Sequence, residues 1–192
     1  MSKETVKKPE VIVFAGPNGS GKSTVTLQAR IIHPYINADN IKAATFCSDL
    51  EAAREAERLR YKAIQEHCGF SFETVFSTER NLVLLKKAKE EGYFIRCIYI
   101  LTDHPQINVI RVSTRVENGG HGVEKEKIIQ RYYKCMKLVP EIFWLSDVFY
   151  LYDNTSLPDR IAMKKRGNLY LYGNEFWDDA RIYDLLGVSV EE

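Results

Sequence analysis

Residues 16–23 read Gly-Pro-Asn-Gly-Ser-Gly-Lys-Ser, and they constrain the fold of this chain more than any other segment. They fit the phosphate-binding loop pattern G-x-x-x-x-G-K-[ST] at every fixed position. Residues 11–15 before the loop are apolar and rich in β-branched side chains, which predicts a buried strand. Residues 24–30 after it can continue as a helix. This order predicts an α/β fold whose first strand leads into the loop.

The residue types of this loop suit a nucleoside triphosphate, although a glycine-rich turn that happens to carry Lys-Ser is the simpler alternative. The glycines allow positive φ angles and a close approach of the backbone to an anion. Loop N–H groups and the next helix dipole then face the phosphates. Lys22 supplies a charge to the β- and γ-phosphates, and the Ser23 hydroxyl ligates Mg²⁺. The predicted ATP-binding residues of the loop are Gly16, Pro17, Asn18, Gly19, Ser20, Gly21, Lys22, Ser23 and Thr24.

Length and composition fit a single domain over residues 1–192. The 27 Lys and Arg against 26 Asp and Glu give a net charge of +1, which is no footprint for long nucleic acid but leaves a short nucleic-acid end open as a substrate. The four cysteines lack metal-ligand spacing and are expected to be free thiols. Neither a signal core nor an apolar run of about 20 residues is found. We therefore expect a cytoplasmic protein without a membrane partner.

Two carboxylates are candidates for the chemistry. Asp39 follows the short strand Tyr35-Ile36, and ligands of open α/β sheets bind at the carboxyl ends of strands. It is either a general base that takes a proton from an attacking hydroxyl or the N-cap of the next helix. Glu73 lies inside the strand-like run 70–76, where an acid needs a partner. We interpret it as a substrate or Mg²⁺ contact, with an exposed edge position as the alternative.

The strand-like run 93–101 ends in Thr102-Asp103, which superficially resembles a Walker B site. Because Asp103 is followed by His-Pro, we favour it as the N-cap of a helix over residues 105–118. Arg111 and Arg115 share one face of that helix, and Arg131 lies in a further helix that opens at Glu124. The glycine-rich residues 118–122 join the two as a hinge. We predict a lid over about residues 111–135, with solvated surface charges as the alternative. The expected core-facing residues of the first lid helix are Ile107, Ile110 and Val116.

The last third of the chain is predicted to complete the sheet. A short helix over 140–146 is followed by a strand over 147–152, whose end at Asp153-Asn154 should adjoin the nucleotide base. Residues 160–172 read as a hairpin that turns at 166–168. A helix over 175–186 is expected to be capped by Asn174 and stopped by Gly187. The predicted architecture is a three-layer α/β sandwich with a mostly parallel central sheet, a helical lid, and a C-terminal β-hairpin plus helix over about 159–187.

Several of these segments together resemble the zeta toxin family of small P-loop kinases. They are residues 15–24, 36–39, 72–74 and 115–123 with Arg131-Tyr132, and Asp153-Asn154 fits as well. The resemblance covers about residues 10–155. It implies a P-loop kinase fold, ATP with Mg²⁺ and phosphorylation of a sugar hydroxyl, which in the toxins belongs to UDP-N-acetylglucosamine. It also implies an antitoxin protein as a partner to look for.

Carried over by position, the resemblance assigns a role to each candidate residue. Lys22 and Ser23 hold nucleotide and metal, with Asn154 beside the nucleotide. Asp39 is the base, and Glu73 with Thr74 contacts the substrate. Arg115 and Arg131 bind the phosphates. Two other functions remain open: a kinase for nucleosides or polynucleotide ends, and a nucleotide-dependent switch with little catalysis.

Overall fold

A seven-stranded sheet forms the centre of the computed structural model, which describes residues 8–120 and 122–189. The strand order is β2-β3-β1-β4-β5-β6-β7. The first five strands of the sequence are parallel, and β6 and β7 add an antiparallel hairpin at one edge. The mostly parallel sheet predicted from the sequence is thus confirmed. The strands are β1 Glu10–Ala15, β2 Tyr35–Ile36, β3 Phe70–Thr74, β4 Phe94–Leu101, β5 Val148–Asp153, β6 Asp159–Lys165 and β7 Asn168–Leu171.

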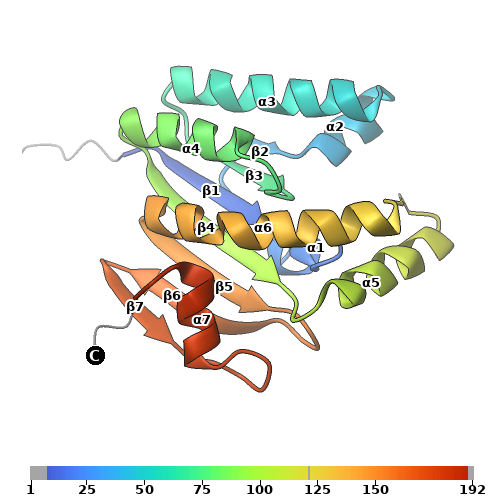
Figure 1. Cartoon of the computed structure of the whole chain (residues 1–192). Helices are drawn as coiled ribbons and strands as arrows, with labels where there is room; N and C mark the ends of the chain where they lie inside the picture. Colours follow the sequence, from blue (N-terminus) through green and yellow to red (C-terminus); the bar gives the residue numbers. More distant parts are fainter. Residues whose placement is uncertain (1–7, 121, 190–192) are drawn as a thin grey trace, which may run out of the picture.

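Helices cover the two faces of the sheet unequally (Figure 1). On one face, α3, α4, α6 and α7 bury the larger apolar cluster. On the other face only α1 and the segment that follows it pack on the sheet, around Ile12 and Phe14. The third layer of the predicted sandwich is therefore thin. The helices are α1 Lys22–Thr26, α2 Ala38–Thr45, α3 Asp49–Gln65, α4 Arg80–Glu90, α5 Pro105–Glu117, α6 Lys125–Leu145 and α7 Asp179–Leu186.

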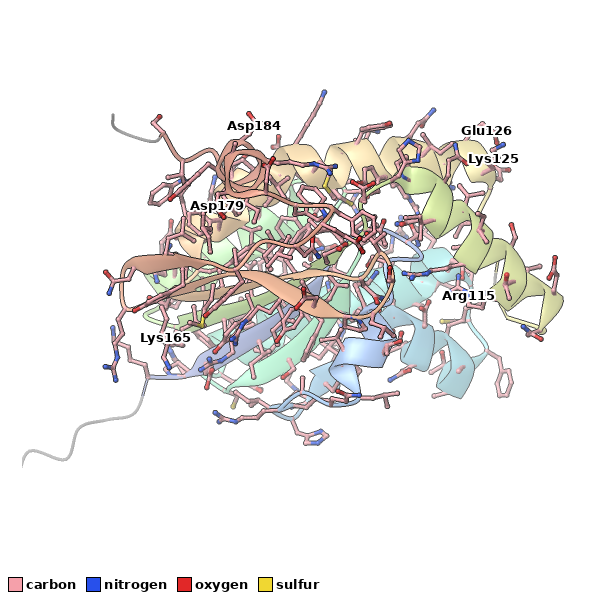
Figure 2. All side chains as sticks on the ribbon, turned by 90° about the horizontal axis from the view of Figure 1, so that it is seen from below. Arg115, Lys125, Glu126, Lys165, Asp179 and Asp184 are labelled. Atoms are coloured by element: carbon pink, nitrogen blue, oxygen red, sulfur yellow. The ribbon has the colours of Figure 1, made fainter. Side chains whose placement is uncertain are left out.

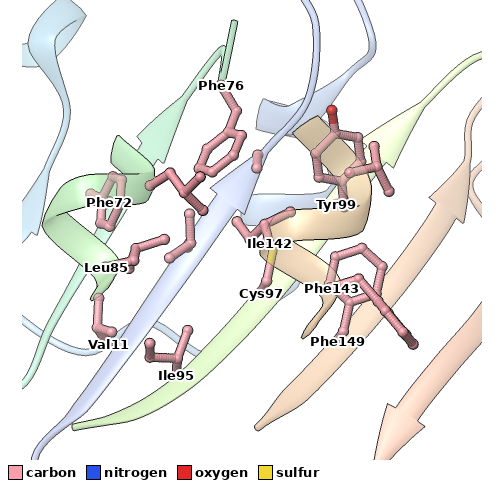
Figure 3. Packing of buried hydrophobic residues seen from close by; sticks show 14 of the residues in the cluster. Val11, Phe72, Phe76, Leu85, Ile95, Cys97, Tyr99, Ile142, Phe143 and Phe149 are labelled. Atoms are coloured by element: carbon pink, nitrogen blue, oxygen red, sulfur yellow. The ribbon is translucent and has the colours of Figure 1, made fainter. Parts of the chain in front are cut away.

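The central strands are buried on both sides, which is why they read as continuous apolar runs. Along β1, Val11, Val13 and Ala15 face the larger cluster while Ile12 and Phe14 face the smaller one. In the larger cluster, Phe143 of α6 meets Phe149 of β5 edge to face, with ring centroids 5.4 Å apart (Figure 3). Such aromatic pairs contribute about 0.5–1.5 kcal/mol beyond the area that they bury. This packing fixes the strands whose ends carry the candidate site.

The topology brings the predicted site residues to one edge of the sheet. Strand β1 lies between β3 and β4. The chain continues from β1 toward the β2–β3 side of the sheet, and from β4 toward the β5 side, so the strand order reverses at β1. In open α/β sheets, ligands bind at such a switch point. Ala15 pairs with Thr74 on one side and Tyr99 on the other. The phosphate loop therefore begins at the switch point, beside the end of β3.

Two helix caps differ from the sequence expectation. Asn37, not Asp39, caps α2, because its side-chain oxygen is already in place to accept the Asp39 N–H at 2.7 Å. His104, not Asp103, caps α5 through its ring nitrogen. The carboxylate of Asp103 instead forms an ion pair with Arg181 of α7. Asp39, for which the cap was one of two alternatives, lies two residues after the cap of α2, and Asp103, the favoured cap, lies one residue before the cap of α5.

The helices of the lid region and of the C-terminal third also depart from expectation. Pro140 does not start a helix but lies inside α6, which runs unbroken from Lys125 to Leu145. The buried face of α5 carries Asn108 and Val112, whereas Ile110 and Val116 are exposed. The reason is that α5 packs at the edge of the sheet, where its neighbour is the polar phosphate loop rather than the apolar core.

The C-terminal elements are confirmed in kind. The hairpin turns at Arg166 and Gly167, both with positive φ, as a tight two-residue connection requires. Helix α7 begins at Asp179 with Asp178 as its cap, later than predicted, because Asn174 instead accepts the N–H groups of a turn at 176–177. Within the described residues, no helix combines the length and the apolar character needed to cross a bilayer.

Candidate active site

The phosphate loop adopts the backbone conformation that its glycines predicted. Gly16, Gly19 and Gly21 have φ values of 145°, 76° and 87°. A Cβ at Gly16 would lie 1.9 Å from the carbonyl oxygen of Ile100, and one at Gly21 would lie 2.0 Å from Nδ2 of Asn154. No side chain fits at either position. The loop is thus a cradle whose inner surface is backbone, as an anion site needs.

Two buried asparagines hold this cradle in shape. Nδ2 of Asn154, just past β5, donates to the Ser20 carbonyl at 2.8 Å. Nδ2 of Asn108, in α5, donates to the Asn18 carbonyl at 2.7 Å. Asn154 was predicted as a nucleotide neighbour, and here it contacts the loop itself. Asn108 was missed, although a polar residue four positions before the buried Val112 is a signal that could have found it.

Lys22 lies at the start of α1 and is almost fully buried. Its ammonium donates to the carbonyl oxygens of Gly16 and Pro17 at 2.9 and 3.0 Å. Burial lowers the pKa of Lys22, while the charges of Glu73 and Asp39 act in the opposite direction and that of Arg115 adds to the lowering. The structure therefore brings three of the predicted charged residues to within electrostatic range of this one ammonium.

Glu73 is level with Phe14 of β1 in the sheet, so its side chain lies on the face that α1 covers. Its Oε2 accepts a hydrogen bond from the hydroxyl of Tyr35 at 3.0 Å, and Asn37 donates to the same hydroxyl at 3.4 Å. Burial raises the pKa of Tyr35 to about 12, so this phenol stays protonated and donates at neutral pH. The expected partner of Glu73 is thus Tyr35, which sequence reasoning missed.

Asp39 is exposed in the first turn of α2, and its charge lies within electrostatic range of Lys22. Because the Asn37 side chain caps the helix, the carboxylate of Asp39 is not used as a cap and is available for chemistry. Thr74, beside Glu73 at the end of β3, is partly exposed. Its hydroxyl oxygen accepts from Asn81 and from the Phe76 amide.

The two lid arginines lie on different helices near the loop. Arg131 of α6 donates to Oδ1 of Asn18 at 3.1 Å. Figure 2 shows Arg115 on α5, across the connection from the start of α6 and at the opposite end of the molecule from Lys165 in the hairpin. Arg111, which the sequence placed in the lid, instead donates to the carbonyls of Asn154 and Thr155 at 2.7 and 3.1 Å. Arg111 therefore anchors α5 to the sheet.

Gly119 and Gly120, in the predicted hinge, form the C-terminal end of α5. The Gly120 amide donates to the Arg115 carbonyl and the Gly119 amide to that of Val116, both at 2.9 Å. This is the Schellman arrangement, with Gly119 at a φ of 81°. His121, which the predicted hinge includes, lies outside the described residues.

Ser23 and Thr24 are exposed in the first turn of α1. Among residues 8–120 and 122–189, no group of three His, Cys, Asp or Glu side chains forms a metal cluster. Mg²⁺ keeps several waters and is usually bound by one or two protein oxygens plus substrate phosphates. The exposed Ser23 hydroxyl beside the cradle fits that manner of binding. The carboxylate of Asp103 is paired with Arg181 of α7.

A glycine cradle at the switch point of a 2-3-1-4-5 parallel sheet, with a buried lysine at the start of the next helix, defines the class of P-loop nucleotide-binding folds. Solved structures agree. A chain from the PezAT toxin–antitoxin system of Streptococcus pneumoniae is 15% identical, with a TM-score of 0.59 over 100% of this chain and 83% of that chain. A chain of the AvrRxo1-ORF1:ORF2 complex with ATP is 12% identical, with a TM-score of 0.61 over 97% and 67%. By fold, this chain is similar to both of these solved structures.

The chain also belongs to one family with a protein of Haemophilus influenzae described as uncharacterized. The two are 32% identical over 137 residues, which cover 66% of this chain and 95% of that protein. A chain of the Pnkp1/Rnl/Hen1 RNA repair complex has the same fold, at 18% identity and a TM-score of 0.56 over 91% of this chain and 56% of that chain. No family model matches the sequence.

Proposed function

We propose that the protein transfers the γ-phosphate of ATP to a hydroxyl of a small molecule, most simply a sugar or nucleotide sugar. The observation that carries this is the buried ammonium of Lys22, which hydrogen-bonds to the glycine cradle and lies within electrostatic range of Glu73, Asp39 and Arg115. A carboxylate opposite a phosphate cradle suits a base that accepts a hydroxyl proton. The guanidinium groups of Arg115 and Arg131 suit the neutralisation of charge on the transferred phosphoryl group.

In this mechanism each residue has one task. The loop amides and Lys22 bind and orient the triphosphate, and Asn108 and Asn154 keep the loop in place. Asp39 takes the proton of the attacking hydroxyl, while Glu73 and Thr74 hold the acceptor. The Ser23 hydroxyl would hold Mg²⁺, whose charge would offset that of the phosphates. Arg115 and Arg131 stabilise the charge of the transferred group.

A second candidate is a kinase for polynucleotide ends, which the similarity to a chain of an RNA repair complex favours. The net charge of +1 argues against a long nucleic-acid track. The toxin–antitoxin neighbours support an antitoxin protein as a partner, by analogy alone.

The test is a transfer assay with ³²P-labelled ATP, Mg²⁺ and a panel of sugars, nucleotide sugars, nucleosides and 5′-hydroxyl oligonucleotides. Label on a sugar or nucleotide sugar is the expected result. Label on oligonucleotides alone would select the second candidate. ATP binding without transfer to any acceptor would reject both and leave a nucleotide-dependent switch.

A further inference from the structure

The hydroxyl of Thr74 is already committed as an acceptor of hydrogen bonds. Nδ2 of Asn81, in the first turn of α4, donates to Oγ1 at 2.7 Å, and the Phe76 amide donates to the same oxygen at 3.1 Å. A threonine hydroxyl has two acceptor lone pairs and one proton. Both lone pairs are therefore used. The proton is all that this hydroxyl can offer to a bound molecule.

Arg60 of α3, which lies outside the site, determines which end of the Asn81 amide faces Thr74. Its NH1 donates to Oδ1 of Asn81 at 3.0 Å. A guanidinium has five donors and no acceptor, so the oxygen of the Asn81 amide must face Arg60. The NH₂ group of the same amide must then face Thr74. A flipped amide would place donors against donors at Arg60.

Arg60 is itself held firmly. Its side chain is 7% exposed, and its guanidinium stacks on the ring of Phe72 at 4.4 Å. Burial lowers the pKa of Arg60 to about 10, so it keeps its charge at neutral pH. Hydrogen bonds from a charged donor are stronger than neutral ones. The buried cation therefore keeps the Asn81 amide in one orientation.

Thr74 lies next to the phosphate loop, where its ability to donate or accept a hydrogen bond affects a bound acceptor. It is partly exposed, it follows Glu73 at the end of β3, and it pairs with Ala15, the residue before the phosphate loop. We propose that Arg60 and Asn81 are positioning residues that make Thr74 an obligatory hydrogen-bond donor to the phosphoryl acceptor. The acceptor then presents an oxygen lone pair, from a carbonyl, ether, hydroxyl or phosphate group, to Thr74. This inference rests on the proposed function, because it assumes an acceptor at the β3 edge of the cleft.

Asn81→Asp tests the polarity with almost no change in shape. One carboxylate oxygen would accept from Arg60, and the other would accept the proton of Thr74, which is then lost to the substrate. We expect the KM for the acceptor found in the transfer panel to rise about five- to tenfold, the loss of one hydrogen bond. Thr74→Val should give the same rise, Thr74→Ser should not, and the double variant should add nothing. The KM for ATP should stay unchanged in all of them.

Asn168→Asp is the matched control, since it makes the same charge change at an exposed position in the hairpin. It should leave both KM values unchanged. A thermal melt checks folding: the carboxylate introduced at position 81 pairs with Arg60, so the melting temperature should not fall. An acceptor KM at the wild-type value in Asn81→Asp would overturn the proposal, as would an equal rise in the KM for ATP.

A second measurement needs no acceptor. In ¹H–¹⁵N spectra of wild-type protein, one side-chain NH of Asn81 should resonate downfield and exchange slowly, because it is bonded to Thr74. Thr74→Val should move it upfield and speed its exchange. An unchanged resonance would overturn the proposed positioning of Thr74 by Arg60 and Asn81, even if transfer is active. Conversely, if the NMR result is as expected but no acceptor is phosphorylated, the proposed function is rejected while the hydrogen-bond chain from Arg60 through Asn81 to Thr74 is supported.

Discussion

At the scale of single residues, Asp39 and Lys22 separate the chemical step from nucleotide binding. Asp39→Asn keeps the shape of the side chain and removes its basicity, so ATP affinity should hold while kcat falls about 10²–10⁴-fold. Lys22→Ala removes the buried ammonium and should weaken ATP binding itself. Fluorescent-ATP titration and the transfer assay measure the two effects. Turnover at the wild-type level in Asp39→Asn would remove the base assignment.

Cys135 offers a second residue-level prediction. Its thiol is fully buried, donates to the Val75 carbonyl at 2.9 Å, and has a pKa that burial raises to about 12. At pH 8 only about 10⁻⁴ of such a thiol is ionised, and the thiolate is the reactive form. Iodoacetamide should therefore label the exposed Cys68 in the native protein and reach Cys135 only after unfolding. Peptide mapping by mass spectrometry reads this out, and native labelling of both at one rate would contradict it.

Local patterns predicted single residues well where one backbone requirement decides the residue type. Gly16 and Gly21 are such positions, because a Cβ would collide with Ile100 or Asn154. They failed where several polar side chains compete for the same backbone amides. Asn37 and His104 cap α2 and α5, the positions considered for Asp39 and favoured for Asp103, because each lies directly before the first residue of its helix. The spacing of residues does not reveal which competitor wins.

At the scale of elements, a side chain in each of α5 and α6 hydrogen-bonds to residues at the ends of the central strands. Arg111 ties α5 to the residues after β5. The hydroxyl of Tyr132 in α6 donates to the Thr102 carbonyl at 2.6 Å. Between these anchors the two helices extend beyond the sheet (Figure 1). The lid over about residues 111–135 stays a prediction, and we expect any movement in it to be confined to the residues between Arg111 and Tyr132.

Hydrogen exchange tests this lid. If it closes on nucleotide, amides of the helical turns at 113–117 and 125–130 should exchange more slowly with ATP and Mg²⁺ than without. Amides at 132–142 should be protected in both states, because Tyr132 and the buried face of α6 already hold them. Arg131→Ala provides the comparison, since it removes the contact to Asn18 and should reduce the ATP-dependent slowing. Equal exchange with and without nucleotide would argue against a lid.

Element boundaries were harder to predict than element types. Pro140 removes one amide hydrogen bond from α6, and a proline usually ends a helix. Here the helix continues because Val139, Ile142 and Phe143 on the same turns are buried in the larger apolar cluster. In α5, the apolar residues Ile110 and Val116 were predicted to face the core, but both are exposed. Tertiary packing, which the local sequence does not contain, decided both cases.

At the scale of the whole molecule, the sequence predicted the fold class because a phosphate loop needs a strand before it and a helix after it. It did not predict the order of strands, since pairing depends on contacts between residues far apart in the chain. The strand order puts Asp39 after β2, Glu73 in β3 and the loop after β1 on one edge. The site therefore exists only in the folded sheet. The hydrogen bonds from Arg60 through Asn81 to Thr74 join α3, α4 and β3, and the local sequence pattern therefore did not predict them.

Ligand binding should consequently stabilise the whole domain. A ligand that binds only the folded state adds RT ln(1 + [L]/Kd), about 2.7 kcal/mol at a hundredfold excess over Kd. For a domain of this size that raises the melting temperature by about 5–10 °C. We expect ATP with Mg²⁺ to give a larger shift than ATP with EDTA. Ser23→Ala should lose the Mg²⁺-dependent part and keep the rest, because the cradle amides and Lys22 still bind the phosphates.

The variant Thr155→Ala serves as the control, since its hydroxyl contacts only Asp153 and the Asp103 amide. It should lower the melting temperature of the free protein but keep the full Mg²⁺-dependent increment. A Ser23→Ala protein with an undiminished increment would show that Mg²⁺ is held elsewhere in the cleft. Glu73 would then be the next residue to substitute, because its carboxylate lies within electrostatic range of Lys22.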